Sequence, residues 1–148
     1  MWRKKRWHGL VRIVLDSNIL ISALLSPKGP PGQLVRLWLE GKFELLTSKA
    51  QIEDLRRVFD YPKIHSRISS EQAADFLNHI DAMATVLDGL PLVELSPDPD
   101  DNVILATAIK AKADCIVSGD RSDLLSLKEA EGIPVITARR ALDRCTSP

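Results

Sequence analysis

Short runs of apolar, often β-branched residues alternate along the chain with longer segments whose apolar residues recur at helical spacing. The short runs are typical of buried strands, and the longer segments are typical of helices that cover a sheet. The runs predict five strands, at Val11–Leu15, Phe43–Thr47, Leu92–Leu95, Cys115–Ser118 and Ile133–Ile136. Because helical segments separate these strands, the sequence predicts an α/β fold with a parallel sheet and helices on both faces.

Capping and stop signals define the helices between the strands. Ser48 and Ser69 each stand three residues before a glutamine, which is the capping-box pattern. Asp98 followed by Pro99 is typical of a helix start. The predicted helices cover residues 17–25, 33–40, 49–59, 70–87, 99–113 and 123–127, and a last helix follows Thr137.

Length and composition fit one domain of an ordinary globular protein. The chain has 148 residues, 45% of them hydrophobic, and its net charge is zero. Zero net charge gives no support to a protein that coats nucleic acid by bulk attraction, although a local grip on phosphates stays open. We expect a basic arm over residues 1–10, the domain over 11–143 and a tail over 144–148. No membrane segment is predicted, and the expected location is the cytoplasm.

Four acidic residues lie where such a fold would bring them to one edge of the sheet. Asp16 and Asp120 follow the first and fourth predicted strands, and open parallel sheets bind ligands at the carboxyl ends of their strands. Glu53 and Asp101 lie near helix starts, from which they can reach the same edge. Together the four carboxylates would repel one another unless a cation neutralised them, and their oxygens suit Mg²⁺ or Mn²⁺. The pattern indicates metal-assisted phosphodiester hydrolysis.

Each acid taken singly also has a structural interpretation. Asp16 could cap the helix that follows it, and Glu53 could be a solvated residue on an amphipathic helix. Asp101 lies in a first helical turn, where the helix dipole favours acids, and Asp120 could be a turn residue. The catalytic interpretation therefore depends on the four positions in combination.

Several segments resemble the motifs of PIN domains. Val14–Asn18 resembles the opening motif, an apolar strand followed by Asp-x-Asn. Asp101–Ala108 is similar to the third motif, and Ala113–Asp120 is similar to the fourth, in which a strand precedes Ser/Thr-x-Asp. Glu53 matches the second acidic position. The resemblance covers residues 11–140 and is greatest to the VapC-like toxins of prokaryotic toxin–antitoxin pairs.

This resemblance implies a sheet ordered 3-2-1-4-5 and a Mg²⁺- or Mn²⁺-dependent ribonuclease that cleaves single-stranded RNA. It also implies a homodimer and a cognate antitoxin protein as partner. The implied catalytic residues and metal ligands are Asp16, Glu53, Asp101 and Asp120. Asn18 and Ser118 would orient these carboxylates, and Asp123 would cap a helix or add to the negative pocket.

Some alternatives stay open at this stage. Asp54 is the neighbour of Glu53 and points about a hundred degrees away from it on a helix, so the second acidic position is the least certain. A dehalogenase-type fold also has Asp after its first strand but requires a second Asp where this chain has Asn18. A receiver domain requires a Lys after the fifth strand and groups its acids differently.

Within the PIN interpretation, a housekeeping RNA-processing nuclease fits the same residues. A non-catalytic PIN module that binds RNA or a protein partner is less favoured, because it would have no need of a repulsive carboxylate cluster. Several basic residues could guide RNA phosphates or could form an ordinary solvated face: Arg56, Arg57, Lys110, Lys112, Arg139 and Arg140.

Overall fold

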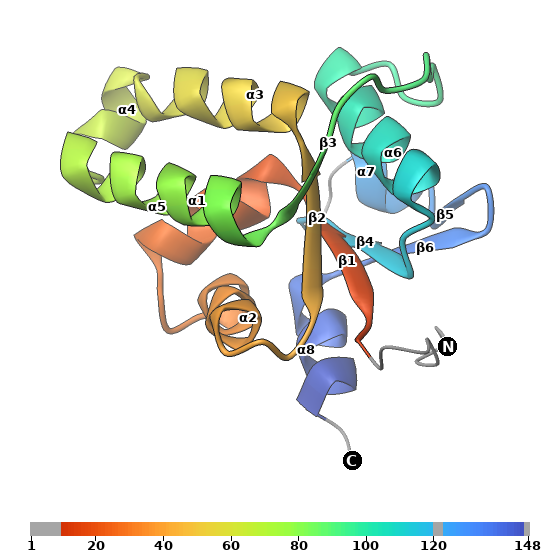
Figure 1. Cartoon of the computed structure of the whole chain (residues 1–148), viewed down its shortest axis with the longest axis horizontal. Helices are drawn as coiled ribbons and strands as arrows, with labels where there is room; N and C mark the ends of the chain where they lie inside the picture. Colours follow the sequence, from red (N-terminus) through yellow and green to blue (C-terminus); the bar gives the residue numbers. More distant parts are fainter. Residues whose placement is uncertain (1–9, 120–122, 147–148) are drawn as a thin grey trace.

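A twisted sheet runs through the middle of the molecule in a computed structural model that describes residues 10–119 and 123–146 (Figure 1). Its strands are β1 (Arg12–Leu15), β2 (Glu44–Ser48), β3 (Thr85–Leu87), β4 (Cys115–Val117), β5 (Glu129–Ala130) and β6 (Ile133–Ile136). They lie in the order β3-β2-β1-β4-β6-β5. All neighbouring strands are parallel except β5 and β6, which form an antiparallel hairpin.

Helices cover both faces of this sheet, as the sequence predicts. Within the described residues they are α1 (Ser17–Leu25), α2 (Pro30–Leu39), α3 (Lys49–Phe59), α4 (Pro62–His65), α5 (Ser70–Met83), α6 (Pro99–Ala111), α7 (Asp123–Ser126) and α8 (Ala138–Thr146). Helices α1, α2, α3, α5 and α8 pack into one core cluster, whereas α6 and α7 pack into a second. No helix in the described part of the chain is long and apolar enough to cross a membrane.

Side chains of the central strands alternate between the two core clusters. Ile13 and Leu15 of β1 join the cluster of α1 and α3, whereas Val14 joins the cluster of α6. All three side chains are fully buried. A parallel strand with helices on both faces has no polar side, and this is why the strands read as continuous apolar runs in the sequence.

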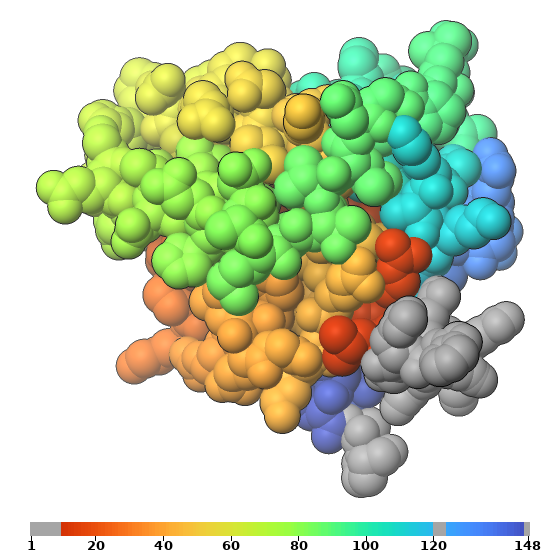
Figure 2. Space-filling model, viewed as in Figure 1, coloured from red at the N-terminus to blue at the C-terminus, as the bar shows by residue number. Residues whose placement is uncertain are grey.

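The third predicted strand is wrong in position. The structure has β3 at Thr85–Leu87, paired with Leu46–Ser48 of β2, while residues 92–95 form part of a surface loop (Figure 2). Leu92 and Leu95 are exposed. The predicted helix over residues 70–87 ends at Met83, because residues 85–87 pair with β2 as a strand.

The predicted order 3-2-1-4-5 holds for the five parallel strands, and the sheet differs only by the added strand β5. This strand is joined to β6 by a two-residue turn at Glu131 and Gly132, with φ values of 49° and 85°. Turns of this kind need left-handed backbone at both positions, and glycine adopts it without steric cost. A strand of two residues leaves no periodic pattern, so the sequence does not predict it.

Candidate active site at the carboxyl edge of the sheet

The strand register places one row of residues along the carboxyl edge of the sheet. Leu15 pairs with Val117, and Val117 pairs with Ile136, so β1, β4 and β6 end side by side. The residues that follow these three are Asp16, Ser118 and Thr137. The backbone N–H of Asp16 donates to the Val117 carbonyl at 2.9 Å, and that of Ser118 donates to the Ile136 carbonyl at 3.0 Å. Ladder hydrogen bonds therefore fix the row beyond the last strand residues.

Asp16 is a buried carboxylate in this row. Its exposed fraction is only 8%, and the Ser118 hydroxyl donates to its Oδ2 at 2.9 Å. Burial raises the pKa of Asp16 from 3.8, and the nearby charge of Asp101 raises it further. The Ser118 hydroxyl and the backbone N–H groups of Asn18 and Ser17 lower the pKa in part. Asp16 is also the N-cap of α1, although its side chain makes no capping hydrogen bond.

Asp101 lies in the first turn of α6 and is the second predicted acid that the structure brings to this place. The Ser96 hydroxyl donates to its Oδ2 at 2.9 Å. The charge of Asp101 raises the pKa of Asp16, so two carboxylates that are far apart in the sequence lie near each other at this edge. Asp98 caps the same helix by accepting from the N–H of Asp100 at 3.0 Å, which confirms the predicted helix start.

Asn102 shapes the loop that leads to these acids. Its Oδ1 accepts from the N–H groups of Leu95 at 3.1 Å and Ser96 at 2.9 Å, and its Nδ2 donates to the Ser96 carbonyl at 2.9 Å. Three hydrogen bonds to one loop fix Ser96, and Ser96 in turn holds Asp101. Asn102 lies in a segment whose sequence pattern does not predict this role. A side chain that bonds to backbone six and seven residues upstream leaves no local signal.

Glu53 and Asp54 of α3 lie in different surroundings. The carboxylate of Glu53 is 72% exposed and lies 3.6 Å from the Arg56 guanidinium. The side chain of Asp54 is only 18% exposed and is paired with Arg57. Burial raises the pKa of Asp54 most, and Asp100 and then Asp98 of α6 raise it further. Of the two neighbours, Asp54 is therefore the one that faces the acidic start of α6.

Gln51 ties the start of α3 to the end of β1. Its Nε2 donates to the Leu15 carbonyl at 2.8 Å and to the Ser17 hydroxyl at 3.3 Å, and its Oε1 accepts from the Thr47 hydroxyl at 2.5 Å. Only 1% of this residue is exposed. The predicted capping box is therefore half confirmed, since Ser48 accepts from the Gln51 N–H at 3.1 Å while the amide side chain points to β1 and β2. Gln51 thus holds both neighbours of Asp16, the backbone carbonyl of Leu15 and the side-chain hydroxyl of Ser17.

The remaining predicted site residues are placed less fully. Asp120 lies outside the described residues, and of Asp123 only the backbone, at the start of α7, is described. The side chain of Asn18 is exposed, and its contribution to Asp16 comes through the backbone N–H. Among the described residues, no group of three or more His, Cys, Asp or Glu side chains is arranged to hold a metal ion.

Comparisons with known proteins agree with this architecture. Residues 12–122 match the PIN domain. The chain is 28% identical over 120 residues to an uncharacterized protein of Methanocaldococcus jannaschii, a match that covers 80% of this chain and 76% of the relative. The crystal structure of PAE2754 from Pyrobaculum aerophilum superposes with a TM-score of 0.57 at 16% identity, covering 100% of this chain and 99% of that one. The last similarity concerns the fold alone.

A parallel α/β domain with acids gathered at the carboxyl edge of its sheet defines a class of domain to which many nucleases belong. The match over residues 12–122 goes further, and this chain belongs to the PIN-domain family, which is a nuclease superfamily.

Proposed function

We propose that the protein is a divalent-metal-dependent endoribonuclease that cleaves single-stranded RNA. The observation that carries the proposal is Asp16, a buried carboxylate whose pKa is raised by burial and by a second acid, Asp101. A buried carboxylate beside another negative charge is unfavourable for folding. Its presence at the ligand-binding edge of a parallel sheet is explained if the position serves catalysis.

The donor set at this edge fits a hard cation. Asp16 and Asp101 offer only oxygen atoms as ligands, which suits a hard cation. The negative charge of Asp101 raises the pKa of Asp16, and a bound cation would neutralise this charge. Asp16, Asp101 and Asp120 would hold Mg²⁺ or Mn²⁺. When bound, the ion supplies charge stabilisation for a phosphodiester under attack and makes water a better nucleophile.

Hydroxyl groups of the chain orient these carboxylates. The Ser118 hydroxyl stabilises the charged form of Asp16, and the Ser96 hydroxyl holds one oxygen of Asp101. A carboxylate oxygen carries more than one lone pair, so an oxygen that accepts a hydrogen bond can still bind a cation. The roles that sequence analysis gives to Asn18, Asp120 and Asp123 stay predictions.

For the second acidic position we propose Asp54 in place of Glu53. The support is burial and charge, because the side chain of Asp54 is only 18% exposed and that of Glu53 is 72% exposed beside Arg56. The charges of Asp100 and Asp98 raise the pKa of Asp54, so Asp54 lies on the side of α3 that is next to the start of α6, where Asp101 also lies. Its pairing with Arg57 restrains its side chain.

The toxin role belongs to the same proposal and is supported by the likeness of the motifs to toxins of toxin–antitoxin pairs. In this role the protein acts in the cytoplasm as a homodimer, and a cognate antitoxin protein inhibits it. A housekeeping RNA-processing nuclease would use the same site without such an inhibitor. Growth arrest on expression, relieved by a small protein encoded beside it, distinguishes the toxin from the processing enzyme.

Cleavage by the purified chain tests the enzymatic proposal. End-labelled single-stranded RNA should be cut with Mg²⁺ or Mn²⁺, and chelation of the metal by EDTA should stop the reaction. Asp16→Asn should also stop it, whereas Asp81→Asn, on the exposed side of α5, should not. Cleavage that persists in EDTA, or full activity of Asp16→Asn, would falsify the proposal.

A further inference from the structure

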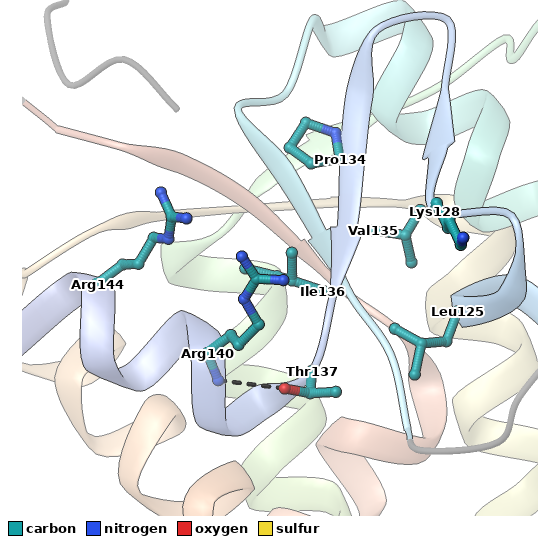
Figure 3. A pocket seen from close by; sticks show the side chains of 8 residues that line it. All are labelled: Leu125, Lys128, Pro134, Val135, Ile136, Thr137, Arg140 and Arg144. Carbon is teal, nitrogen blue, oxygen red and sulfur yellow. Dashed lines mark hydrogen bonds between the residues drawn. The ribbon is translucent and has the colours of Figure 1, made fainter. Parts of the chain in front are cut away.

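A basic groove lies over β6, next to the carboxyl edge. It has a volume of about 470 Å³, and Figure 3 shows Arg140 and Arg144 of α8 on one side of β6 and Lys128 on the other. The remaining lining residues are Leu125, Pro134, Val135, Ile136 and Thr137. Among the described residues that line it, three are cations and none is acidic. A cavity of this charge is suited to an anion.

We propose that this basic groove binds backbone phosphates of the RNA strand next to the bond that is cleaved. The inference rests on the proposed function, since it takes Asp16 as the centre of the reaction. Thr137 lines the groove and belongs to the same row at the carboxyl edge as Asp16, two strands away from it. Two β-strand spacings are roughly 10 Å, so an RNA strand that lies across Asp16 reaches the groove with its neighbouring phosphates.

Two cations of the groove, Lys128 and Arg140, are available for such a ligand. Within the described residues neither Lys128 nor Arg140 forms an ion pair, whereas Arg12 is bound to Glu44 at 3.2 Å. Arg140 and Arg144 stand four positions apart on α8 and therefore lie on the same face of the helix. The Thr137 hydroxyl accepts from the Arg140 N–H at 3.2 Å, so the start of α8, and with it Arg140, is fixed beside β6.

The backbone of Lys128 adds to this argument. Its φ is 66°, a left-handed conformation that costs a lysine energy and would cost a glycine almost none. Its carbonyl accepts from the Val135 N–H at 2.9 Å, which holds the residue against β6 at the mouth of the groove. This hydrogen bond keeps the start of the Lys128 side chain beside the groove that it lines.

The structure also separates the basic residues that sequence analysis treats as one set. Arg140 lines the basic groove, whereas its neighbour Arg139 is exposed on α8 outside it. Lys112 also has left-handed backbone, with φ 56°, but it caps the far end of α6. Arg139 and Lys112 are therefore matched controls for Arg140 and Lys128.

Binding in EDTA, where cleavage is stopped, tests the groove separately from the chemistry. A fluorescent single-stranded RNA of mixed sequence is titrated with the full chain at several salt concentrations. Arg140→Gln and Lys128→Gln should each weaken binding by roughly threefold to tenfold and lower the salt slope by about 0.7. Arg139→Gln and Lys112→Gln should bind as the wild type does. Under cleaving conditions the groove variants should raise KM and leave kcat unchanged.

The outcomes separate this inference from the proposed function. Equal affinity of the groove variants and their controls would overturn the inference even if RNA is cleaved. Competition by poly-glutamate as strong as competition by RNA would overturn it too, because the groove would then be a site for acidic peptides. If no metal supports cleavage but the groove variants still lose RNA affinity, the proposed nuclease is wrong and the RNA groove stands.

Discussion

Burial is the largest cause that raises the pKa of both Asp16 and Asp54, but the two carboxylates have different partners. Asp16 lies in the row fixed by β1, β4 and β6, and its main partner is the neutral hydroxyl of Ser118. Asp54 lies on one turn of α3 and is paired with the positive charge of Arg57. Asp16 therefore lowers the stability of the folded protein, whereas the positive charge of Arg57 offsets the charge of Asp54 locally.

The strongest test of this contrast is the activity of Asp16→Asn. Removing the charge should lower kcat/KM about a thousandfold, because a metal that is no longer held loses several kcal/mol of charge stabilisation in the transition state. Initial rates on labelled RNA with Mg²⁺ measure the loss. A decrease of only a few fold would mean that the reaction is centred on other acids.

A second test decides between the two neighbours on α3. Asp54→Asn should lower kcat/KM by about tenfold to a hundredfold, as is usual for groups that support a metal site. Glu53→Gln is the matched control and should stay within about twofold, because Glu53 meets only solvent and Arg56. The reverse ranking would restore the assignment of Glu53 from sequence.

The brace at Gln51 gives a third test, in which stability is measured. Gln51→Leu keeps the bulk of the side chain but leaves the Leu15 carbonyl and the Thr47 hydroxyl without their partner. Unsatisfied buried polar groups cost about 1–3 kcal/mol each, so urea unfolding should show a loss of about 2 kcal/mol or more. Gln72→Leu, in the exposed capping box of α5, should lose less. Equal losses in the two variants would contradict the role of Gln51 as a brace.

The smallest expected effect concerns the pH dependence of stability without metal. The folded-state pKa of Asp16 is raised above 3.8, so the folded protein binds a proton more tightly than the unfolded chain does. The contribution of Asp16 to stability therefore becomes unfavourable as the pH rises from 3.8 toward the folded-state pKa. In EDTA at neutral pH, Asp16→Asn should melt at a higher temperature than the wild type, and the advantage should vanish toward pH 3.8. An equal advantage at both pH values would argue against charge as the cause.

The sequence predicts those elements and site residues that depend on a local pattern of residues. Four of the five parallel strands lie within one or two residues of their predicted positions, because each is an apolar run buried on both faces. Asp16 and Asp101 are found from the same pattern, since one follows a strand and the other begins a helix. The cap at Asp98 is likewise encoded by a few neighbouring residues.

What the sequence does not predict depends on neighbours that are distant in the chain. Strand β3 has three half-buried residues, and its position is set by pairing with Leu46–Ser48 of β2. The choice between Glu53 and Asp54 depends on where α6 packs beside α3. The amide of Gln51 finds its partners on β1, 36 residues earlier in the chain. No window of a few residues contains these contacts.

The hydrogen bond between Ser118 and Asp16 joins positions 102 residues apart. A contact of such sequence separation forms only after most of the chain has been synthesised and the loop between its ends has closed. During translation, a growing chain that has not yet reached β4 contains Asp16 but lacks the neighbouring strand that orders its carboxylate. A chain that stops before β4 therefore lacks the ordered pair of Ser118 and Asp16, and under the proposed function it should not cleave RNA.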